Sequence, residues 1–274
     1  MGTRQDSLVA QWQTILKLTR TNGIRWSLLF LAFYGWQRIS GHRWMGGQRA
    51  LLHLEKKNDL PGVSSLEFNA QTWREWNWSR RGEEWTPSPE WKQSLIDHVL
   101  LPQVPKDRTV LEIGPGGGRW TETLQRISRD LILVDLSETC IEECRRRFAA
   151  CTNITYHVGS GHDLGFQADE SVEVIWSFDV FVHIAPPETK AYVAEIARVL
   201  RPGGRGIIHH PRAAGLQGGF RSRMTSEHFA ELLGQYGLSV ETQLERWGDH
   251  GQWDVKFYDD AITIFEKPGP GSRD

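Results

Sequence analysis

From residue 90 onward, the chain alternates between two apolar patterns. Short, nearly continuous apolar segments are typical of buried strands, whereas the stretches between them repeat apolar positions at helical spacing. The predicted strands are residues 109–113, 131–134, 154–158, 172–178 and 205–209. Strands that alternate with helices in this way predict an α/β domain with a parallel, doubly wound sheet.

The pattern changes near the C-terminal end. A helix is predicted near residues 225–236, and two further apolar segments follow at 238–246 and 261–266. No obvious helix lies between these two segments. They therefore suit a hairpin.

The first 89 residues differ in kind from the rest and are predicted to form a helical N-terminal extension. Leu8, Trp12, Ile15 and Leu16 keep helical spacing, and residues 24–36 are mostly apolar. Nine of the thirteen tryptophans lie within the first 91 residues. The predicted organisation is this Trp-rich extension (1–89), an α/β domain (90–268) and a short tail (269–274).

Charge sets the same region apart. Residues 1–50 carry seven basic side chains and one acidic side chain, a local charge of 7 − 1 = +6, whereas the whole chain has a net charge of −2. The segment could be a basic amphipathic helix on an anionic membrane, or an extension that packs its tryptophans on the α/β domain, on a second subunit or over a substrate. We favour packing, because aromatic residues at helical spacing are more often core than membrane anchor. The apolar stretch is short for a bilayer span, and no cleavage pattern of a signal peptide follows it.

A glycine-dense turn follows the first predicted strand and opens a helix. Glycine stands at positions 114, 116, 117 and 118. Such a turn allows positive φ and lets the backbone approach a nucleotide-like ligand closely. The dinucleotide fingerprint G-x-G-x-x-G would require glycine at position 119 or 121, but Arg119 and Thr121 stand there. The loop therefore predicts a nucleotide-like ligand other than a dinucleotide.

The run Glu-x-Gly-x-Gly-x-Gly from Glu112 to Gly118 resembles the first motif of the class I S-adenosylmethionine (SAM) dependent methyltransferases. Asp135 ends the second strand, 135 − 114 = 21 residues after the first glycine. The segments 159–164, 179–184 and 201–204 also resemble family features in the expected order. The resemblance covers about residues 90–267. It implies a Rossmann-like, seven-stranded sheet closed by the antiparallel C-terminal hairpin.

The resemblance also implies a cofactor site for SAM, with S-adenosylhomocysteine as product. The glycines of the loop would cradle the methionine portion, Glu112 would support the loop from behind, and Asp135 would hold the ribose. Ser160, Gly161 and His162 would edge the adenine, and Phe178 would lie beside the sulfonium. The predicted cofactor residues are Glu112, Gly114, Pro115, Gly116, Gly118, Asp135, Leu136, Ser160, Gly161, His162 and Phe178.

One tryptophan of the extension joins this set. The segment 78–87 resembles the Trp-rich, Arg-Gly-containing segment that covers the cofactor in methyltransferases of the thiopurine and tellurite-resistance type. A tryptophan face near a sulfonium is favourable through cation–π attraction. We therefore place Trp85 at the cofactor, with a plain surface turn as the alternative.

Catalytic candidates are expected after strands four and five. SAM already carries an activated methyl group, so the protein must align the acceptor, exclude water and, for neutral acceptors, remove a proton. Asp179 and His183 follow strand four, and His183 is the preferred base because imidazole titrates near neutral pH. His209 and His210 alternate across strand five, so one of them is expected to face the pocket; His210 is the third candidate.

Net charge and motifs give no support for a nucleic-acid acceptor. A pI near 6.6 gives no global case for nucleic-acid binding, and the Asn-Pro-Pro-Tyr type of motif is absent after strand four. Cys140 and Cys144 are interpreted as small apolar residues on a helix, so no metal site is predicted.

We therefore predict a cytoplasmic SAM-dependent methyltransferase that acts on an oxygen, nitrogen or sulfur atom of a small molecule. A homo-oligomer and a peripheral membrane contact stay open. The alternatives are a non-catalytic SAM-binding subunit whose N-terminal region recruits a partner or a membrane, and an enzyme that methylates protein or RNA.

Overall fold

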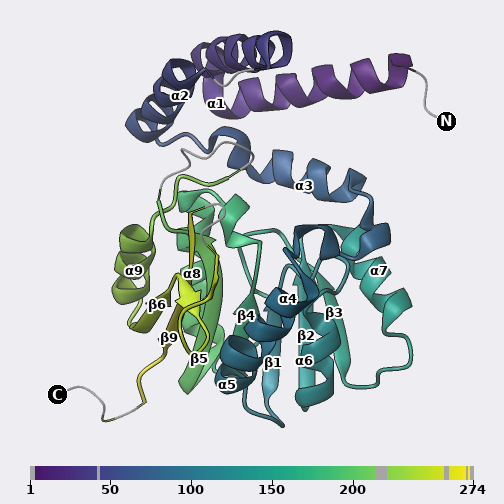
Figure 1. Cartoon of the computed structure of the whole chain (residues 1–274), viewed down its shortest axis with the longest axis vertical. Coiled ribbons are helices and arrows are strands. Elements are labelled where there is room, and N and C mark those ends of the chain that lie inside the picture. The colour runs from purple at the N-terminus through teal and green to yellow at the C-terminus, as the bar shows by residue number, and fades with distance from the viewer. Residues whose placement is uncertain (1–3, 42–43, 214–220, 256–258, 270, 272–274) are drawn as a thin grey trace.

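The computed structural model describes residues 4–41, 44–213, 221–255, 259–269 and 271 (Figure 1). Its centre is a seven-stranded sheet with the strand order β3-β2-β1-β4-β5-β9-β6. The strands are β1 (Thr109–Ile113), β2 (Asp130–Asp135), β3 (Ile154–Val158), β4 (Val172–Ser177), β5 (Leu200–Pro211), β6 (Ser239–Leu244) and β9 (Asp260–Glu266). The first five are parallel, and β9 runs antiparallel to both β5 and β6. This arrangement confirms the predicted Rossmann-like fold.

Helices cover both faces of the sheet. Side chains of α4 (Pro89–Leu95), α6 (Thr121–Ile127) and α7 (Glu138–Arg147) form one core with the sheet, and α8 (Pro186–Val199) and α9 (Ser226–Gln235) form the other. After α4 the chain continues through a π-helical turn (Ile96–Leu100) into α5 (Leu101–Gln103). Alternate residues of β1 supply the two cores: Val110 points to the first and Leu111 to the second. Because both faces of the sheet are covered, successive side chains of a central strand such as β1 are buried in opposite cores, which explains why that strand is mostly apolar.

The C-terminal hairpin is longer than its sequence pattern indicates. Between β6 and β9 the chain forms a separate two-stranded ribbon, β7 (Arg246–Trp247) with β8 (Trp253–Asp254). The predicted turn at residues 201–204 lies inside β5, because Leu200 already pairs with Val172 and the register then shifts. Gly203 has a φ of 75°, so the irregularity is a bulge rather than a break.

The N-terminal extension is helical, as predicted. It contains α1 (Arg4–Ser40), α2 (Met45–Asn58), a 3-10 turn (Gly62–Ser64), α3 (Leu66–Glu75) and two further 3-10 turns (Trp78–Arg80 and Glu83–Trp85). Figure 1 shows α1 and α2 as a layer above α3, which lies over the sheet. Gly23, with φ 81° and ψ 162°, kinks α1. None of the described helices is long and apolar enough to cross a membrane.

The layer of α1 and α2 has a small core of its own. Leu18, Trp26 and Leu51 are buried there. The indole Nε1 of Trp26 donates to Oε1 of Glu55 at 2.7 Å, and burial raises the pKa of Glu55 to about 7. Asn22 holds the segment that follows α2 by accepting from the backbone N–H of Gly62 at 2.7 Å.

Candidate functional site

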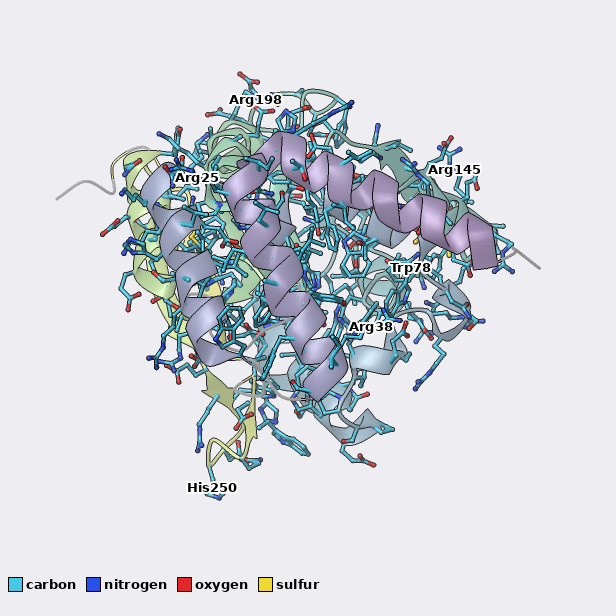
Figure 2. All side chains as sticks on the ribbon, turned by 90° about the horizontal axis from the view of Figure 1, so that it is seen from above. Arg25, Arg38, Trp78, Arg145, Arg198 and His250 are labelled. Carbon is cyan, nitrogen blue, oxygen red and sulfur yellow. The ribbon has the colours of Figure 1, made fainter. Side chains whose placement is uncertain are left out.

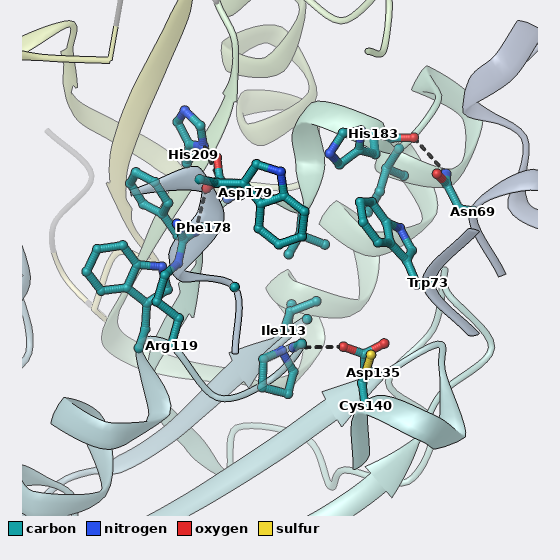
Figure 3. A pocket seen from close by; sticks show the side chains of 18 of the residues that line it. Asn69, Trp73, Ile113, Arg119, Asp135, Cys140, Phe178, Asp179, His183 and His209 are labelled. Carbon is teal, nitrogen blue, oxygen red and sulfur yellow. Dashed lines mark hydrogen bonds and ion pairs between the residues drawn. The ribbon is translucent and has the colours of Figure 1, made fainter. Parts of the chain in front are cut away.

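A cavity of about 590 Å³ lies at the carboxyl ends of β1, β2, β4 and β5, underneath the N-terminal extension. This is the edge at which open α/β sheets bind ligands. Its lining comes mainly from the loops after the strands, the segment from Ser64 to Trp91, and residues near β8 and β9, with further side chains from α7 and α8 and from Arg221. Figure 3 shows the cavity with side chains from the sheet and from α3 facing one another.

The glycine loop forms the floor of the cavity. Gly114 and Gly116 have φ angles of 72° and 54° and line the cavity. A Cβ atom at Gly114 would lie 2.3 Å from a methyl carbon of Val180, and one at Gly116 would lie 2.7 Å from the ring of Trp78. Both positions therefore require glycine. Gly118 does not line the cavity, because it is turned toward α7, where its carbonyl accepts from Nη1 of Arg147 at 2.7 Å.

Asp135 stands beside this loop at the end of β2. Its carboxylate accepts from the backbone N–H of Gly116 at 3.1 Å (Figure 3). It also accepts from the backbone N–H of Ser137 at 2.9 Å. Burial raises the pKa of Asp135 to about 6. The side chain lines the cavity together with Pro115 and Leu136. The arrangement offers a carboxylate to ligand hydroxyl groups at the position where the sequence predicts the ribose.

Glu112 lies behind the loop, outside the cavity. It is buried, and its Oε2 accepts from the Thr121 hydroxyl at 2.6 Å. Burial raises the pKa of this carboxyl to about 8. Glu112 thus ties the end of β1 to the start of α6.

The loop after β3 contributes less than the sequence suggests. Gly161 lines the cavity, where Leu66 of α3 and Leu136 approach it closely. Ser160 and His162 do not line it: the Ser160 hydroxyl is hydrogen-bonded to Asp163 and accepts from the backbone of the loop. The wall at this point is therefore formed by backbone and leucine side chains.

Of the three catalytic candidates, two line the cavity. His183 follows β4, its ring packs edge-on against Trp73 with centroids 5.1 Å apart, and its carbonyl accepts from Nδ2 of Asn69 at 2.8 Å. Asp179 also lines the cavity, with a φ of 61°. Figure 3 shows His183 and Trp73 on the side of α3, with Asp179 across the cavity.

His210 does not reach the cavity, which corrects its choice over His209. Its Nε2 lies 2.6 Å from Oγ1 of Thr263 and its Nδ1 lies 2.9 Å from the carbonyl of Pro211. The ring is buried on the face of β5 that packs against α9, and burial lowers its pKa to about 4. His209, on the other face of the same strand, lines the cavity.

His209 belongs to a buried row of charges that the sequence did not reveal. Its Nδ1 lies 3.1 Å from Oδ1 of Asp179, and its Nε2 lies 3.2 Å from Oδ2 of Asp260. Arg119 pairs with Asp179 at one end, and Arg221 pairs with Asp260 at the other. All five side chains line the cavity. The row places two carboxylates between three cationic or ionisable groups, so its charges largely neutralise one another.

The pKa values of Asp179 and His209 are set by their charged neighbours in the row. Burial alone would raise the pKa of Asp179, but Arg119 and His209 outweigh it and hold that pKa well below its usual range. Burial alone would lower the pKa of His209, but Asp260 and Asp179 raise it. A carboxylate next to each ring nitrogen leaves His209 poorly placed to take a proton from a ligand. Asp179 stays ionised and is a fixed negative charge rather than a base.

Pairing with Asp179 does not satisfy the whole guanidinium of Arg119. The Nη1 atom of Arg119 is buried and has no hydrogen-bond partner among the described residues. An unsatisfied buried guanidinium nitrogen is costly, and it lies at the wall of a ligand-sized cavity. The guanidinium also packs over Trp120, 4.9 Å from the ring centroid. Arg119 is therefore suited to hold a carboxylate of a bound molecule.

Tryptophans form the roof. Trp73, Trp76, Trp78 and Trp85 pack on one another with centroid separations between 5.1 and 6.1 Å, and all line the cavity. Trp85, predicted from sequence to lie at the cofactor, is part of this group. Three more aromatic residues line the cavity near Arg119: Trp91, Trp120 and Phe178. Across the described residues, no group of histidine, cysteine or acidic side chains has the arrangement of a metal site.

Comparison with known proteins agrees with this geometry. Residues 110–204 match the family model described as a methyltransferase domain, which spans the glycine loop, Asp135 and the loop after β4. Residues 110–204 are therefore a methyltransferase domain. The fold matches a TehB-like SAM-dependent methyltransferase from Corynebacterium glutamicum with a TM-score of 0.52 and 24% identity, over 74% of this chain and 97% of that one.

Curated relatives of this methyltransferase domain differ in the molecules that their names mention. The chain is 24% identical to a ubiquinone biosynthesis O-methyltransferase of Hydrogenovibrio crunogenus, over 57% of this chain and 62% of that protein. It is 27% identical to a dimethylglycine N-methyltransferase of Parasynechococcus marenigrum, over 64% of each chain. The chain thus spans less than two thirds of the length of either relative.

Proposed function

We propose that the protein transfers a methyl group from SAM to an oxygen, nitrogen or sulfur atom of a small-molecule acceptor. The observation that carries the proposal is that the two ends of one cavity are lined by chemically different residues. One end has the glycine loop and Asp135, and the other has Trp73 and His183. A cavity of about 590 Å³ lies within the range of roughly 300–1,000 Å³ that is usual for small-molecule sites.

The residues at the first end fit SAM. The backbone of Gly114 and Gly116 would hold the methionine portion, with its carboxylate on Nη1 of Arg119. Asp135 would accept from the ribose hydroxyls, and Gly161 would border the adenine. SAM supplies a methyl group on a cationic sulfur, which is already activated for in-line displacement. The aromatic faces of Phe178 and the tryptophan roof suit such a cation.

The residues at the second end fit a mainly apolar acceptor. The tryptophan roof excludes water, and the charges of Asp179 and Arg119 on the other side of the cavity are paired with each other. His183 is the candidate that would take a proton from a neutral acceptor, because it lines the cavity at this end whereas His210 does not. The names of the curated relatives include O- and N-methyltransferases of small molecules, which supports this class of acceptor.

The test is S-adenosylhomocysteine formation by the purified full chain with a panel of phenols, amines, thiols and small acids. We expect turnover with at least one class. His183→Asn should then lower kcat by about 100-fold or more, within the usual range for general-base catalysis. His162→Asn is the matched control and should change kcat less than twofold, because its ring lies outside the cavity.

Two results would contradict parts of the proposal. If SAM binds but no acceptor class gives turnover, the chain is better described as a non-catalytic SAM-binding subunit. If His183→Asn retains full kcat over the pH range in which imidazole titrates, methyl transfer proceeds without this base.

A further inference from the structure

The second half of α1 is apolar on two opposite faces. Its inner face packs on α2: Trp26 is buried, and Phe30 and Phe33 are packed against the same small core. Its outer face is not covered by any described part of the chain. A helix that is apolar all round is normally buried on all sides. The outer face of α1 therefore lacks the partner that its composition calls for.

The exposed apolar side chains lie in one strip along the helix. Ile24, Leu28, Leu31 and Ile39 are exposed to 68%, 63%, 40% and 89%. Their spacing of four, three and eight residues keeps them on one side of an α-helix at about 100° per residue. These four side chains form what we call the outer strip. Because the opposite face is buried against α2, the outer strip points away from α2.

Basic side chains border the outer strip, and acidic ones are missing from the same stretch. At about 100° per residue, Arg25 and Arg38 fall on opposite sides of the strip, and Figure 2 shows α1 from above with both of them labelled. Residues 15–41 include Lys17 and Arg20 in addition, and contain no aspartate or glutamate. Tyr34 and Trp36, which are both exposed, also lie in this part of α1.

We propose that the outer strip docks α1 onto an anionic membrane surface, with the helix lying in the plane of the interface. Apolar side chains between flanking arginines, with exposed tyrosine and tryptophan, match the composition of helices that rest at the boundary between headgroups and acyl chains. The basic side chains supply the attraction to anionic lipids. The inner face stays packed on α2, so α1 meets the membrane along its side.

Charge favours a membrane over a second copy of the chain. A two-fold interface through the outer strip would bring the same surface from both copies together. It would place the arginines of two helices near one another without an acidic residue from either stretch to pair with them. Lipid phosphate groups provide the opposite charge that this surface lacks.

The test is co-sedimentation of the full chain with vesicles. We expect binding to phosphatidylcholine vesicles that contain phosphatidylglycerol, weak binding to phosphatidylcholine alone, and a loss of binding as salt is raised. Leu28→Asp combined with Ile39→Asp should weaken binding at least tenfold. Val158→Asp is the matched control, because Val158 is also an exposed apolar residue but lies at the end of β3; it should bind like the unchanged chain.

A second variant pair separates docking from folding. Arg25→Gln combined with Arg38→Gln keeps the outer strip apolar and should remove most of the preference for anionic vesicles. Circular dichroism should show unchanged helix content in both pairs, since all four side chains are exposed. Equal sedimentation of the unchanged chain with neutral and anionic vesicles would overturn the proposal. So would a dimer, measured by light scattering without lipid, that Leu28→Asp with Ile39→Asp dissociates.

Discussion

The methyltransferase domain and the layer of α1 and α2 use apolar side chains in different ways. In the domain, both faces of the sheet are covered, and the polar groups that matter are collected at one edge around a cavity. In the layer, one face of α1 makes a small core and the other is left exposed. The domain therefore encloses a ligand-sized cavity, whereas the layer presents an apolar face that suits contact with a surface.

The segment that joins these two regions, from α3 to the 3-10 turn at Glu83–Trp85, helps to enclose the cavity. The tryptophans of α3 and of the 3-10 turns roof the cavity, while Trp36 of α1 and Trp44 before α2 are exposed. For the extension, the sequence favours packing of its tryptophans on the α/β domain, on a second subunit or over a substrate. This interpretation agrees with the positions of Trp73 and Trp85 at the cavity, but not with the exposure of the outer strip.

The largest effect that would sharpen this contrast is expected at the floor of the cavity. Gly114→Ala places a methyl group against Val180 and forces an alanine into a left-handed conformation. We expect SAM affinity to fall more than 100-fold, as measured by calorimetry, with vesicle binding unchanged. Gly203→Ala is the matched control, because Gly203 has a similar φ of 75° but open space around it. Similar SAM affinities for the two variants would contradict the assigned loop.

A smaller effect is expected from pH on cofactor binding. The carboxylate of Asp135 must be ionised to accept hydrogen bonds from both ribose hydroxyls, and its pKa is raised to about 6 by burial. SAM affinity should therefore be constant above this value and fall by about tenfold per pH unit well below it. Calorimetric titrations from neutral to mildly acidic pH measure the profile. A flat profile that Asp135→Asn leaves unchanged would remove Asp135 from the cofactor site.

The smallest effect concerns the core of the layer. Glu55 has a pKa raised from 4.5 to about 7, so the folded protein keeps a proton that the unfolded chain releases. The free energy of unfolding should therefore fall as pH rises through this window. Glu55→Gln keeps the acceptor for Trp26 and should flatten that part of the profile. Thermal unfolding followed by circular dichroism would show the difference as a shift of several degrees in the unfolding temperature. Identical profiles for the two proteins would contradict the buried, protonated state of Glu55.

Local patterns in the sequence were sufficient to predict the sheet and the cofactor loop. A strand that runs into closely spaced glycines, and a carboxylate at the end of the next strand, are set by neighbouring residues. The places of Gly114, Gly116 and Asp135 on the cavity therefore follow from chain order alone. The same holds for Glu112, whose direction alternates with that of its neighbours along β1.

The buried row of charges could not be predicted in this way. Its members come from five separate segments, and β9 brings Asp260 to the site only because it inserts between β5 and β6. Alternation along β5 indicates that either His209 or His210 faces the cavity, but the choice depends on which face of the strand packs against α9. Likewise, the sequence of α1 does not indicate which of its two apolar faces packs on α2.

The central claim is that the cavity binds SAM through the glycine loop and Asp135. Calorimetric titration of the full chain with SAM, S-adenosylhomocysteine and NAD tests it most directly, with Asp135→Ala compared against Asp130→Ala at the exposed start of the same strand. We predict binding of the first two ligands only, weakened at least tenfold (about 1.4 kcal/mol) by Asp135→Ala and unchanged by Asp130→Ala. Binding of NAD alone, binding of no ligand, or equal affinities for the two variants would contradict the claim.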